Sequence, residues 1–200
     1  MLTELDINTE EIKAKVLSYE EDWISRATAF PFYTLGRSAY LDGKKASYFD
    51  SEVMNTELCA SFSGLYAKVL AALSDQLGEG VYMTEDLACP GFHIFRSAPQ
   101  MTNMAGDWHY DYPHITLGIQ AKDVSSFTVA IALPASGGGM DYLDDKGNEC
   151  HIPYIEGGML VHSGATRHRI SGLKEYTRGE YRITLQGHLI RRAGKMEVFW

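Results

Sequence analysis

The sequence predicts a mainly β (α+β) protein, in which a closed core of short strands is supported on one side by N-terminal helices. Apolar residues recur at helical spacing in two stretches of the first 80 residues. From residue 81 onward the chain breaks into short β-rich runs bounded by Gly, Pro, Asn and Asp. A length of 200 residues suits one domain with a sizeable core. We therefore expect a single domain over 1–200, with a largely helical buttress at 1–80 and a β core at 81–200.

Residues 9–26 are predicted to form the first helix. Asn8 and Glu11 have the spacing of a capping box, in which two side chains satisfy free backbone N–H groups at a helix start. The predicted inner face consists of apolar residues at helical spacing, namely Ile12, Val16, Tyr19 and Trp23. Residues 30–50 contain Pro and Gly at intervals, which favours turns and short elements over a long helix.

A second helix is predicted from Thr56 to Leu77. Apolar residues recur along it without interruption at helical spacing: Leu58, Phe62, Leu65, Val69, Leu73 and Leu77. A helix with such a continuous apolar face can cover one side of a β core.

Short strands are predicted for most of the remaining chain. The candidates are Val81–Thr84, Gly91–Arg96, Trp108–Asp111, His114–Gln120, Ser126–Leu133, Met140–Leu143, His151–Ile155, Met159–His162, His168–Ile170, Arg178–Ile190 and Met196–Trp200. The segment Asp144–Asn148 has the composition of a hairpin turn. Many short strands at near-regular spacing favour a closed β architecture, but periodicity alone does not separate one sandwich or barrel from another.

Composition and charge disfavour several kinds of partner. The formal net charge is −8, whereas binding nucleic acid needs a positive surface for the phosphates. The first residues lack the features of a secretory signal, and no run of about 18 apolar residues could span a membrane. The three cysteines, Cys59, Cys89 and Cys150, lack paired spacing, which favours a reducing compartment. We expect a cytoplasmic protein that binds neither nucleic acid nor membranes, as a monomer or a homodimer.

A His-x-Asp pattern supplies two candidate metal ligands. Side chains i and i+2 of an extended strand point to the same face, so His109 and Asp111 can aim an imidazole and a carboxylate at one point. A third ligand would come from the segment Gly157–Ile170, which contains His162 and His168. Two histidines and one carboxylate on one side of a metal leave open positions opposite them, the arrangement used by non-haem Fe(II) oxygenases.

A buried arginine is expected further along the chain. On the predicted strand at 178–190, Arg182, Thr184, Gln186 and His188 fall on one face, and apolar residues fall on the other. An unpaired buried guanidinium is costly, and its planar fork can donate two parallel hydrogen bonds to a carboxylate. Arg182 is therefore expected to meet either a protein carboxylate or the carboxylate of a bound ligand.

The ordered set of His109-x-Asp111, a distal histidine and Arg182-x-Thr184 resembles the Fe(II)/2-oxoglutarate-dependent dioxygenase superfamily, with its prolyl-hydroxylase-like and phytanoyl-CoA-hydroxylase-like small-molecule oxygenases. The resemblance covers residues 91–190. It implies a double-stranded β-helix core, also called a jelly roll or cupin-like barrel. It further implies an oxidoreductase that uses Fe(II), 2-oxoglutarate and O2, with ascorbate as an optional stimulant.

The same resemblance implies the site residues, which are His109, Asp111 and His168 for iron and Arg182 and Thr184 for 2-oxoglutarate. His168 is preferred to His162 because Arg182 lies fourteen residues after His168, close to the family pattern, but twenty after His162. Related halogenases carry a small residue at the position of Asp111, so the carboxylate favours hydroxylation or desaturation. The roles of His162, Gln186 and His188 remain open.

The implied reaction hydroxylates an unactivated C–H bond of a small amino-acid-like or anionic metabolite and releases succinate and CO2. Residues expected to contact substrate near the rim are Arg96, Tyr110, His114, Tyr142 and Arg167. The arginines would receive a carboxylate or a phosphate. Three alternatives stay open: a cupin-like metalloenzyme that does not use 2-oxoglutarate, a hydroxylase of a protein or peptide residue, and a metal-free jelly-roll binding module.

Overall fold

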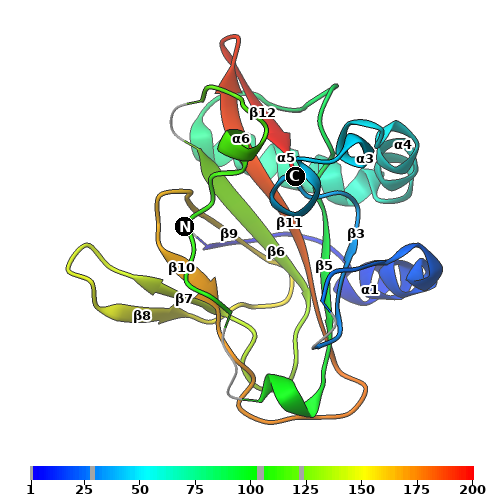
Figure 1. Ribbon diagram of the computed structural model, residues 1–200, viewed down its shortest axis with the longest axis vertical. Coiled ribbons are helices and arrows are strands. Elements are labelled where there is room, and N and C mark those ends of the chain that lie inside the picture. The colour runs from blue at the N-terminus through cyan, green and yellow to red at the C-terminus, as the bar shows by residue number, and fades with distance from the viewer. Residues whose placement is uncertain (1, 28–29, 103–105, 122–123) are drawn as a thin grey trace.

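The core of the protein is built from β-sheets in the computed structural model, which describes residues 2–27, 30–102, 106–121 and 124–200 (Figure 1). The strands of the main sheet are β1 (Leu2–Glu4), β2 (Ile24–Ser25), β3 (Phe32–Leu35), β4 (Val81–Met83), β5 (Gly91–Arg96), β6 (Ser125–Ala132), β9 (Gly158–Ser163), β11 (Tyr181–Arg192) and β12 (Lys195–Phe199). Their order is β1-β9-β6-β11-β5-β3-β2, while β12 pairs with both β11 and β4.

A smaller sheet has the order β10-β7-β8. Its strands are β7 (Met140–Leu143), β8 (Glu149–Ile152) and β10 (His168–Ile170). A bridge between His109 and His168 attaches one more extended segment to the edge of this sheet. From β5 to β11 the chain therefore passes back and forth between the two sheets, which is the winding of a jelly roll or double-stranded β-helix. The predicted mainly β fold class is confirmed.

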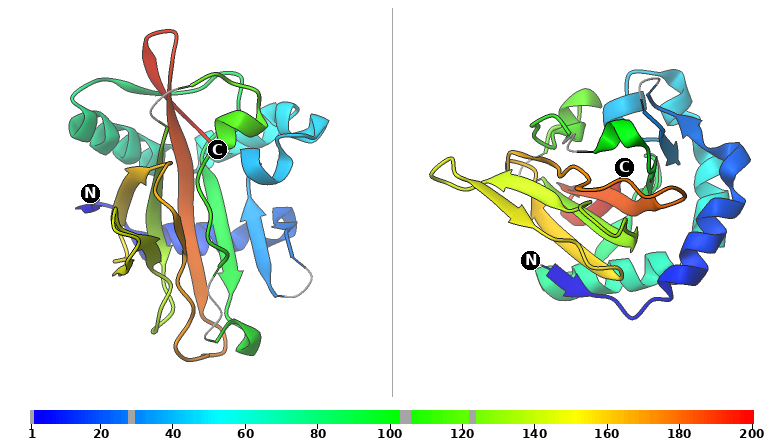
Figure 2. Two further views of the ribbon diagram at one scale, coloured as in Figure 1. Left: turned by 60° about the vertical axis from the view of Figure 1, so that its left-hand side comes forward. Right: turned by 90° about the horizontal axis from the view of Figure 1, so that it is seen from below.

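Helices lie mainly in the N-terminal part of the chain. They are α1 (Thr9–Ser18), α2 (Ala39–Asp42), α3 (Ala46–Phe49), α4 (Glu52–Ser61), α5 (Ser63–Leu77) and α6 (Pro113–Thr116), with 3-10 turns at Glu20–Asp22 and Pro99–Met101. Figure 2 shows α1 and α5 on one side of the main sheet and the smaller sheet on the other. Val16 of α1 and Leu73 of α5 are buried in one cluster with Leu185 of β11. Within the described ranges, no helix is both long and apolar enough to cross a bilayer.

The first predicted helix is present but shorter than expected. The side chain of Asn8 accepts a hydrogen bond from the backbone N–H of Glu11 at 3.2 Å and caps α1. The helix does not continue to residue 26, because the chain turns and Trp23 folds back against the helix. Its indole N–H donates to the carbonyl of Val16 at 3.2 Å.

The second predicted helix is divided into α4 and α5. The two helices meet at Phe62, whose backbone leaves the helical conformation (φ −113°, ψ 25°). Phe62 is buried and packs against Phe92 of β5, with ring centroids 4.7 Å apart. Helix α5 ends at Gly78, which has φ +68°, a left-handed conformation that glycine adopts without strain. The apolar spacing thus predicts the inner face but not the break.

The prediction of a strand at 114–120 is wrong. Pro113 instead begins the short helix α6, where its missing N–H is not needed. The segment 108–111, also predicted as a strand, contributes only the bridge at His109. In the N-terminal part, β1, β2 and β3 join the main sheet although no strands were predicted there. Strand β3 pairs with β5 in a register that places Phe32 opposite Phe95.

A buried ion pair attaches α2 to the strands β2 and β3. The guanidinium of Arg26 donates from Nη1 to Oδ1 of Asp42 at 2.8 Å and from Nη2 to Oδ2 at 2.5 Å, and its Nε–H donates to Oγ1 of Thr34 at 2.8 Å. Burial alone would raise the pKa of Asp42, but the hydrogen bonds from Arg26 and from the backbone of Ser38 outweigh burial and lower it. This pair holds α2, which contributes Tyr40, at the wall of a large cavity.

Candidate active site

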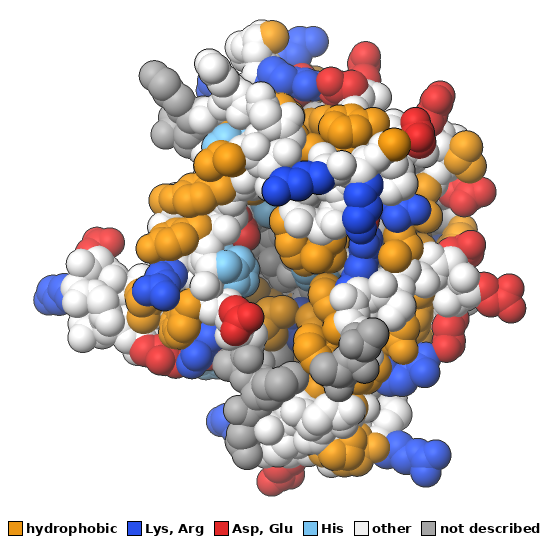
Figure 3. All heavy atoms as spheres, in the orientation of Figure 1, with side chains coloured by type: hydrophobic (Ala, Val, Ile, Leu, Met, Phe, Trp, Pro, Cys, Tyr) orange, Lys and Arg blue, Asp and Glu red, His pale blue; other side chains and the backbone are white. Residues whose placement is uncertain are grey.

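A cavity of about 940 Å³ lies between the two sheets. In Figure 3 it is a hollow with histidine side chains within it and hydrophobic side chains on both sides. Its polar lining residues are Tyr40, His93, Asp107, His109, Tyr110, Asp111, Tyr112, Thr116, Ser126, Thr128, Tyr154, His162, His168, Arg169, Ser171, Arg182, Gln186 and His188. Three residues of the predicted polar face of β11 therefore line the cavity, namely Arg182, Gln186 and His188, whereas Thr184 is buried and is not part of the lining. Ile183 and Leu185 on the other face are buried in the core below α1 and α5.

Three predicted metal ligands meet in this cavity. Nε2 of His168 lies 3.6 Å from Oδ2 of Asp111, and Nε2 of His109 lies 3.8 Å from Oδ1 of Asp111. One ligand atom from each of the three residues lies within 4.8 Å of the other two. Donor atoms at such separations can each approach a common ion at about 2 Å. The arrangement can therefore hold a metal with two nitrogens and one carboxylate oxygen.

Backbone carbonyls set the tautomer of both imidazoles. Nδ1–H of His109 donates to the carbonyl of Asp107 at 2.8 Å, and Nδ1–H of His168 donates to the carbonyl of Thr166 at 2.9 Å. A carbonyl can only accept, so Nδ1 carries the proton and the lone pair of Nε2 is directed at the cluster. Burial lowers the pKa of His168 to about 4, which keeps this imidazole neutral at neutral pH.

The carboxylate of the cluster is ionised. Burial opposes the charge of Asp111, but the neighbouring imidazoles of His188 and His168 and a hydrogen bond from Ser126 together lower its pKa. The backbone of Asp111 is also fixed, because its N–H donates to the carbonyl of Gly164 at 3.0 Å. A single carboxylate thus faces the Nε2 atoms of His109 and His168.

The alternative ligand His162 also reaches the cavity. Its Nε2 lies 3.9 Å from Oδ2 of Asp111, and its ring centroid lies 4.5 Å from that of His168. Its Nδ1–H donates to the carbonyl of Ser163 at 3.0 Å. The group whose ligand atoms all lie within 4.8 Å of one another contains His168 and not His162, so distance favours His168.

Arg182 is buried in the same cavity, as the sequence predicts. Arg182 is only 3% exposed. Its guanidinium donates from Nε to the carbonyl of Gly138 at 3.0 Å and from Nη1 to Oγ1 of Thr184 at 3.3 Å. Positive φ angles at Gly137 (+87°) and Gly138 (+83°) shape the loop that presents this carbonyl. Nη2 is buried without a hydrogen-bond partner among the described residues. The guanidinium therefore retains capacity for an anion.

Further polar groups surround the cluster and the arginine. Gln186 donates from Nε2 to Oγ1 of Thr184 at 3.5 Å, and Nδ1 of His188 lies 2.9 Å from Oγ of Ser126. On the other wall the hydroxyl of Tyr40 is 2.6 Å from Nε2 of His93.

Sequence reasoning did not assign the polar cavity residues of β6 or Tyr154. The alternation of Ser126 and Thr128 on one face of the mostly apolar strand β6 could have indicated that they face a cavity. The ring of Tyr154 lies 5.5 Å from the Cζ atom of Arg182. No local pattern in the sequence marks this tyrosine.

The predicted substrate residues are divided between the cavity and other places. Tyr110 lines the cavity mouth. His114 lies beside Tyr112, with ring centroids 6.0 Å apart, and is not part of the lining. Arg96 donates to the carboxylate of Glu20 at 2.5 Å and packs over aromatic rings on the far side of β5.

Tyr142 and Arg167 also lie outside the cavity lining. The phenol of Tyr142 interacts with the thiol of Cys150 on the neighbouring strand, and Arg167 is exposed. The expected substrate contacts of Arg96, Tyr142 and Arg167 therefore stay a prediction, since none of these residues lines the cavity.

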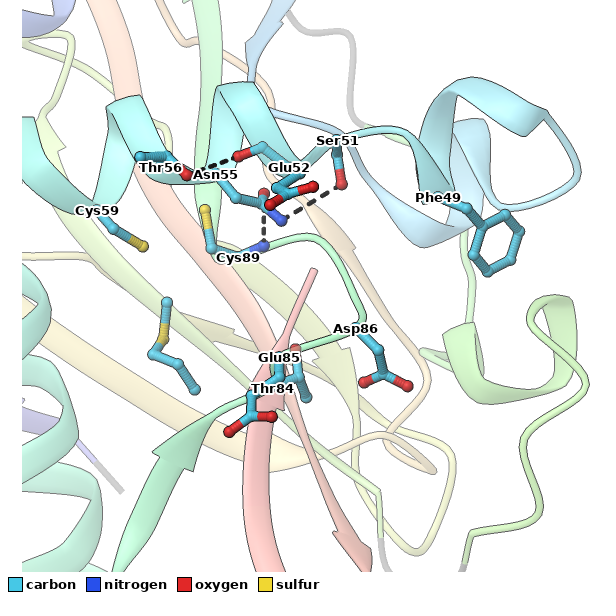
Figure 4. Close-up of a pocket in the computed structure, with 11 residues that line it drawn as sticks. Phe49, Ser51, Glu52, Asn55, Thr56, Cys59, Thr84, Glu85, Asp86 and Cys89 are labelled. Atoms are coloured by element: carbon cyan, nitrogen blue, oxygen red, sulfur yellow. Dashed lines mark hydrogen bonds between the residues drawn. The ribbon is translucent and has the colours of Figure 1, made fainter.

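A second cavity of about 460 Å³ lies between α4 and the segment before β5 (Figure 4). Asn55 joins the two, because its amide donates to the carbonyl of Leu87 at 3.2 Å and its Oδ1 accepts from the backbone N–H of Cys89 at 3.1 Å. The thiols of Cys59 and Cys89 both border this space. A hydrogen bond from the Cys89 thiol lowers the pKa of Cys59 to about 7.

Comparison with known proteins finds no matching family model and no matching curated protein, but several solved structures are similar. One is a prolyl-4-hydroxylase from Pseudomonas putida (15% identity, TM-score 0.51, covering 97% of this chain and 92% of that one). Another is an oxidoreductase of the 2OG-Fe(II) oxygenase family from Burkholderia pseudomallei (13% identity, TM-score 0.51, covering 86% and 74%). A third is the epimerase SnoN in complex with Fe3+, alpha ketoglutarate and nogalamycin RO (11% identity, TM-score 0.54, covering 96% and 82%). At these identities the likeness concerns the fold, and the chain has the fold of the 2-oxoglutarate/Fe(II)-dependent oxygenases.

Proposed function

We propose that the protein is an Fe(II)- and 2-oxoglutarate-dependent oxygenase that hydroxylates an unactivated C–H bond of a small molecule. One observation carries the proposal. A cluster of two histidines and one aspartate shares a cavity with a buried arginine whose Nη2 has no hydrogen-bond partner among the described residues. Either half alone would be weak support, because histidine clusters and buried arginines each occur for other reasons. Their combination matches what a metal and a dicarboxylate cosubstrate need together.

The donor set fits iron. His109, Asp111 and His168 would hold the ion, since neutral imidazoles and one carboxylate suit Fe(II) and leave positions open for other ligands. When bound, the iron would supply the activation of O2 that is coupled to the oxidation of 2-oxoglutarate to succinate and CO2. The carbonyls that accept from the Nδ1–H groups would keep both imidazoles oriented, as outer hydrogen bonds do at metal sites.

The arginine fits the cosubstrate. Arg182 would bind the distal carboxylate of 2-oxoglutarate, because an anion would both compensate the charge of the buried guanidinium and accept from its free Nη2. Oγ1 of Thr184 already accepts from Nη1 of Arg182 and from Nε2 of Gln186, so its own hydroxyl hydrogen is available to donate to the same carboxylate. The solved structure of SnoN with Fe3+ and alpha ketoglutarate supports a fold of this kind binding both groups.

A cupin-like metalloenzyme that does not use 2-oxoglutarate is the main competitor. It would need the metal cluster but would have no use for the free Nη2 of the buried Arg182. A peptide substrate, as the name of the prolyl-4-hydroxylase suggests for that protein, is a second alternative. A measurement of 2-oxoglutarate binding distinguishes the proposed oxygenase from the cupin-like metalloenzyme. A substrate screen distinguishes a small-molecule substrate from a peptide.

The direct test measures metal and cosubstrate binding separately. The purified protein should bind Fe(II) anaerobically, and adding 2-oxoglutarate should produce a weak visible charge-transfer band. His109→Ala and His168→Ala should abolish the band and lower Fe(II) affinity, whereas Arg182→Met should retain Fe(II) and lose 2-oxoglutarate in a calorimetric titration. His151→Ala is the matched control, because His151 is exposed, binds Asp141 and lies outside the cavity. His162→Ala should retain the band.

Two results would contradict the proposal. Full Fe(II) affinity in the His109 and His168 variants would refute the ligand assignment. Unchanged 2-oxoglutarate affinity in Arg182→Met would refute the cosubstrate assignment and favour the cupin-like alternative.

A further inference from the structure

Building on the proposed function, we propose that the substrate is a bulky, uncharged molecule with a planar ring, bound between two groups of stacked aromatic side chains at the mouth of the cavity. This differs from the small anionic metabolite that the sequence predicts. Ring geometry, cavity size and the pairing of the local charges all support it.

The first aromatic group consists of Phe30, Phe32 and Phe95. Strand pairing places Phe32 of β3 directly opposite Phe95 of β5, and their rings stack with centroids 4.4 Å apart and planes inclined by 6°. The ring of Phe30 is parallel to both, at 6.3 Å from each centroid. All three residues line the cavity. Together they form an apolar wall, against which a planar ring can pack at the end of the stack or along the ring edges.

The second aromatic group lies on the segment that carries two of the candidate metal ligands. The rings of Tyr110 and Tyr112 stack with centroids 5.7 Å apart and planes inclined by 11°. They are 48% and 41% exposed, and the neighbouring Ile115 is 66% exposed. All three border the same cavity. A contiguous exposed apolar surface at a cavity mouth is typical of a ligand-binding site.

The cavity is larger than the cosubstrate alone requires. Ligand cavities commonly measure roughly 300–1,000 Å³, and this one is near the upper end at about 940 Å³. Even at the roughly 30 Å³ that one water molecule takes in the liquid, the non-hydrogen atoms of 2-oxoglutarate would fill only about a third of it. The remaining space suits a molecule of several rings better than a short amino acid.

The charges near the mouth do not favour an anion. Arg169 lines the cavity, but its guanidinium donates to Asp141 at 3.3 Å and Glu149 at 2.7 Å and stacks over Trp108 at 4.4 Å. Arg182 is assigned to 2-oxoglutarate. Among the described lining residues these two are the arginines, and none is a lysine. The carboxylate of Asp107 at the mouth would repel an anion.

A neutral polar group adjoins the phenylalanine wall. The ring of His93 stands edge-on to Phe32 at 5.1 Å, and its Nε2 is hydrogen-bonded to the hydroxyl of Tyr40. Its Nδ1 is buried without a partner among the described residues. Desolvation holds the pKa of His93 well below its ordinary value, so the ring is uncharged. Such a pair can orient a hydroxyl or carbonyl of an otherwise apolar substrate.

The test uses two probes that share one ring system and differ in charge, 2-naphthol and 2-naphthoate. Binding is measured by calorimetry to the anaerobic Fe(II)–2-oxoglutarate complex, in which no turnover occurs. We expect 2-naphthol to bind at least about tenfold more tightly than 2-naphthoate, because no arginine or lysine of the described lining is left to pair with the anion once 2-oxoglutarate is bound. Equal binding, or tighter binding of 2-naphthoate, would overturn the assignment of an uncharged substrate.

Variants locate the probe. Phe32→Ala and Tyr112→Ala should each weaken the binding of 2-naphthol by about tenfold, since each removes a stacking ring and its apolar area. Phe32→Leu keeps most of the apolar volume but removes the ring, and it should still weaken the binding of 2-naphthol. This variant therefore distinguishes ring stacking from the burial of apolar area. Tyr82→Ala is the matched control, because Tyr82 is 55% exposed on β4 and does not line the cavity. Tyr112 is on the surface, so its variant keeps the test valid if Phe32→Ala does not fold. Unchanged affinity in the Phe32 and Tyr112 variants would overturn the proposal.

The two proposals fail in different ways. A charge-transfer band without 2-naphthol binding would refute the substrate class and leave the oxygenase assignment intact. Binding of 2-naphthol to the two aromatic groups without any band would refute the oxygenase assignment and leave the ring site in place.

Discussion

His109 and His168 hold each other through the backbone. The N–H of His109 donates to the carbonyl of His168 at 2.9 Å, and the N–H of His168 donates to the carbonyl of His109 at 3.0 Å. Their ring centroids lie 4.4 Å apart. Two imidazoles 59 residues apart in the sequence are thereby fixed as neighbours by main-chain bonds that do not involve the imidazole side chains. The cluster is therefore sensitive to changes that move the backbone, even where no ligand is altered.

Gly164→Ala should impair metal binding without touching a ligand. A Cβ at this position would lie 2.5 Å from the carbonyl oxygen of Asp111 and 3.0 Å from that of Val124, and both are backbone atoms that cannot rotate away. The segment carrying Asp111 must shift, and we expect metal affinity to fall by roughly tenfold or more, as at other sites whose supporting contacts are disturbed. Calorimetric titration with Fe(II) or Mn(II) measures this.

Gly64→Ala is the matched control for that substitution. Gly64 lies within α5, and its added Cβ would meet nothing within 4 Å, so metal affinity should stay unchanged while stability rises slightly. Equal metal affinity in the two alanine variants would show that the Asp111 backbone tolerates displacement and would contradict the expectation.

Arg182→Met should have opposite effects on the free and the cosubstrate-bound protein. In the free protein the buried guanidinium lacks a full set of partners, so replacing it by an apolar side chain should be neutral or stabilising by about 1 kcal/mol or more. Addition of 2-oxoglutarate should raise the Tm of the natural protein, because a ligand that binds only the folded state stabilises it, and should leave the variant unchanged. Thermal unfolding with and without 2-oxoglutarate measures both effects. A variant that is strongly destabilised when free would mean that Arg182 has mainly a structural role.

Local patterns in the sequence bring the candidate metal ligands together better than they predict the surrounding residues. The i, i+2 spacing of His109 and Asp111 and the alternation along β11 survive in the structure because an extended backbone alone dictates them. The choice between His168 and His162 depends on which one pairs with His109 across the sheet edge. That register is a tertiary property, which the spacing to Arg182 indicates only indirectly.

The surroundings of residues whose contacts are distant in the sequence were predicted less well. The salt-bridge partner of Arg96 is Glu20, 76 positions earlier, and nothing local to Arg96 indicates it. The aromatic wall depends on β3 pairing with β5, and β3 was not predicted because residues 30–50 are rich in turn formers. Helix-forming periodicity likewise could not reveal the break at Phe62, which follows from packing against Phe92.

Asp42→Asn should strongly destabilise the fold. Both side chains of the Arg26–Asp42 pair are almost inaccessible to solvent (6% and 0% exposed), and removing one charge leaves the other buried and unpaired at a cost of about 3–5 kcal/mol. Asp6→Asn is the control, because the Asp6–Lys68 pair is exposed and should change stability by less than about 1 kcal/mol. Urea unfolding measures the free energy of unfolding of both variants. A small effect of Asp42→Asn would contradict the expectation that Arg26 needs the charge of Asp42.

The contribution of Asp42 should also depend on pH. Its pKa is lower in the folded than in the unfolded chain, so the stabilisation is fully present above the unfolded value of about 3.9 and is lost as pH falls through the folded value. The difference in unfolding free energy between the natural protein and Asp42→Asn should be constant near neutral pH and shrink in acid. A difference that persists unchanged well below pH 3 would contradict this expectation.

Cys59 should be the most reactive thiol near neutral pH on the wall of the second cavity. The thiolate is the nucleophile, and the hydrogen bond from Cys89 lowers the pKa of Cys59 to about 7, compared with about 8.5 for an unperturbed cysteine. The rate of alkylation by iodoacetamide, followed by mass spectrometry of the Cys59 peptide, should therefore rise with pH and level off above a midpoint near 7. Cys89→Ala removes the donor and should move the midpoint upward toward the unperturbed value. A midpoint that is the same with and without Cys89 would mean that the neighbouring thiol does not stabilise the thiolate of Cys59.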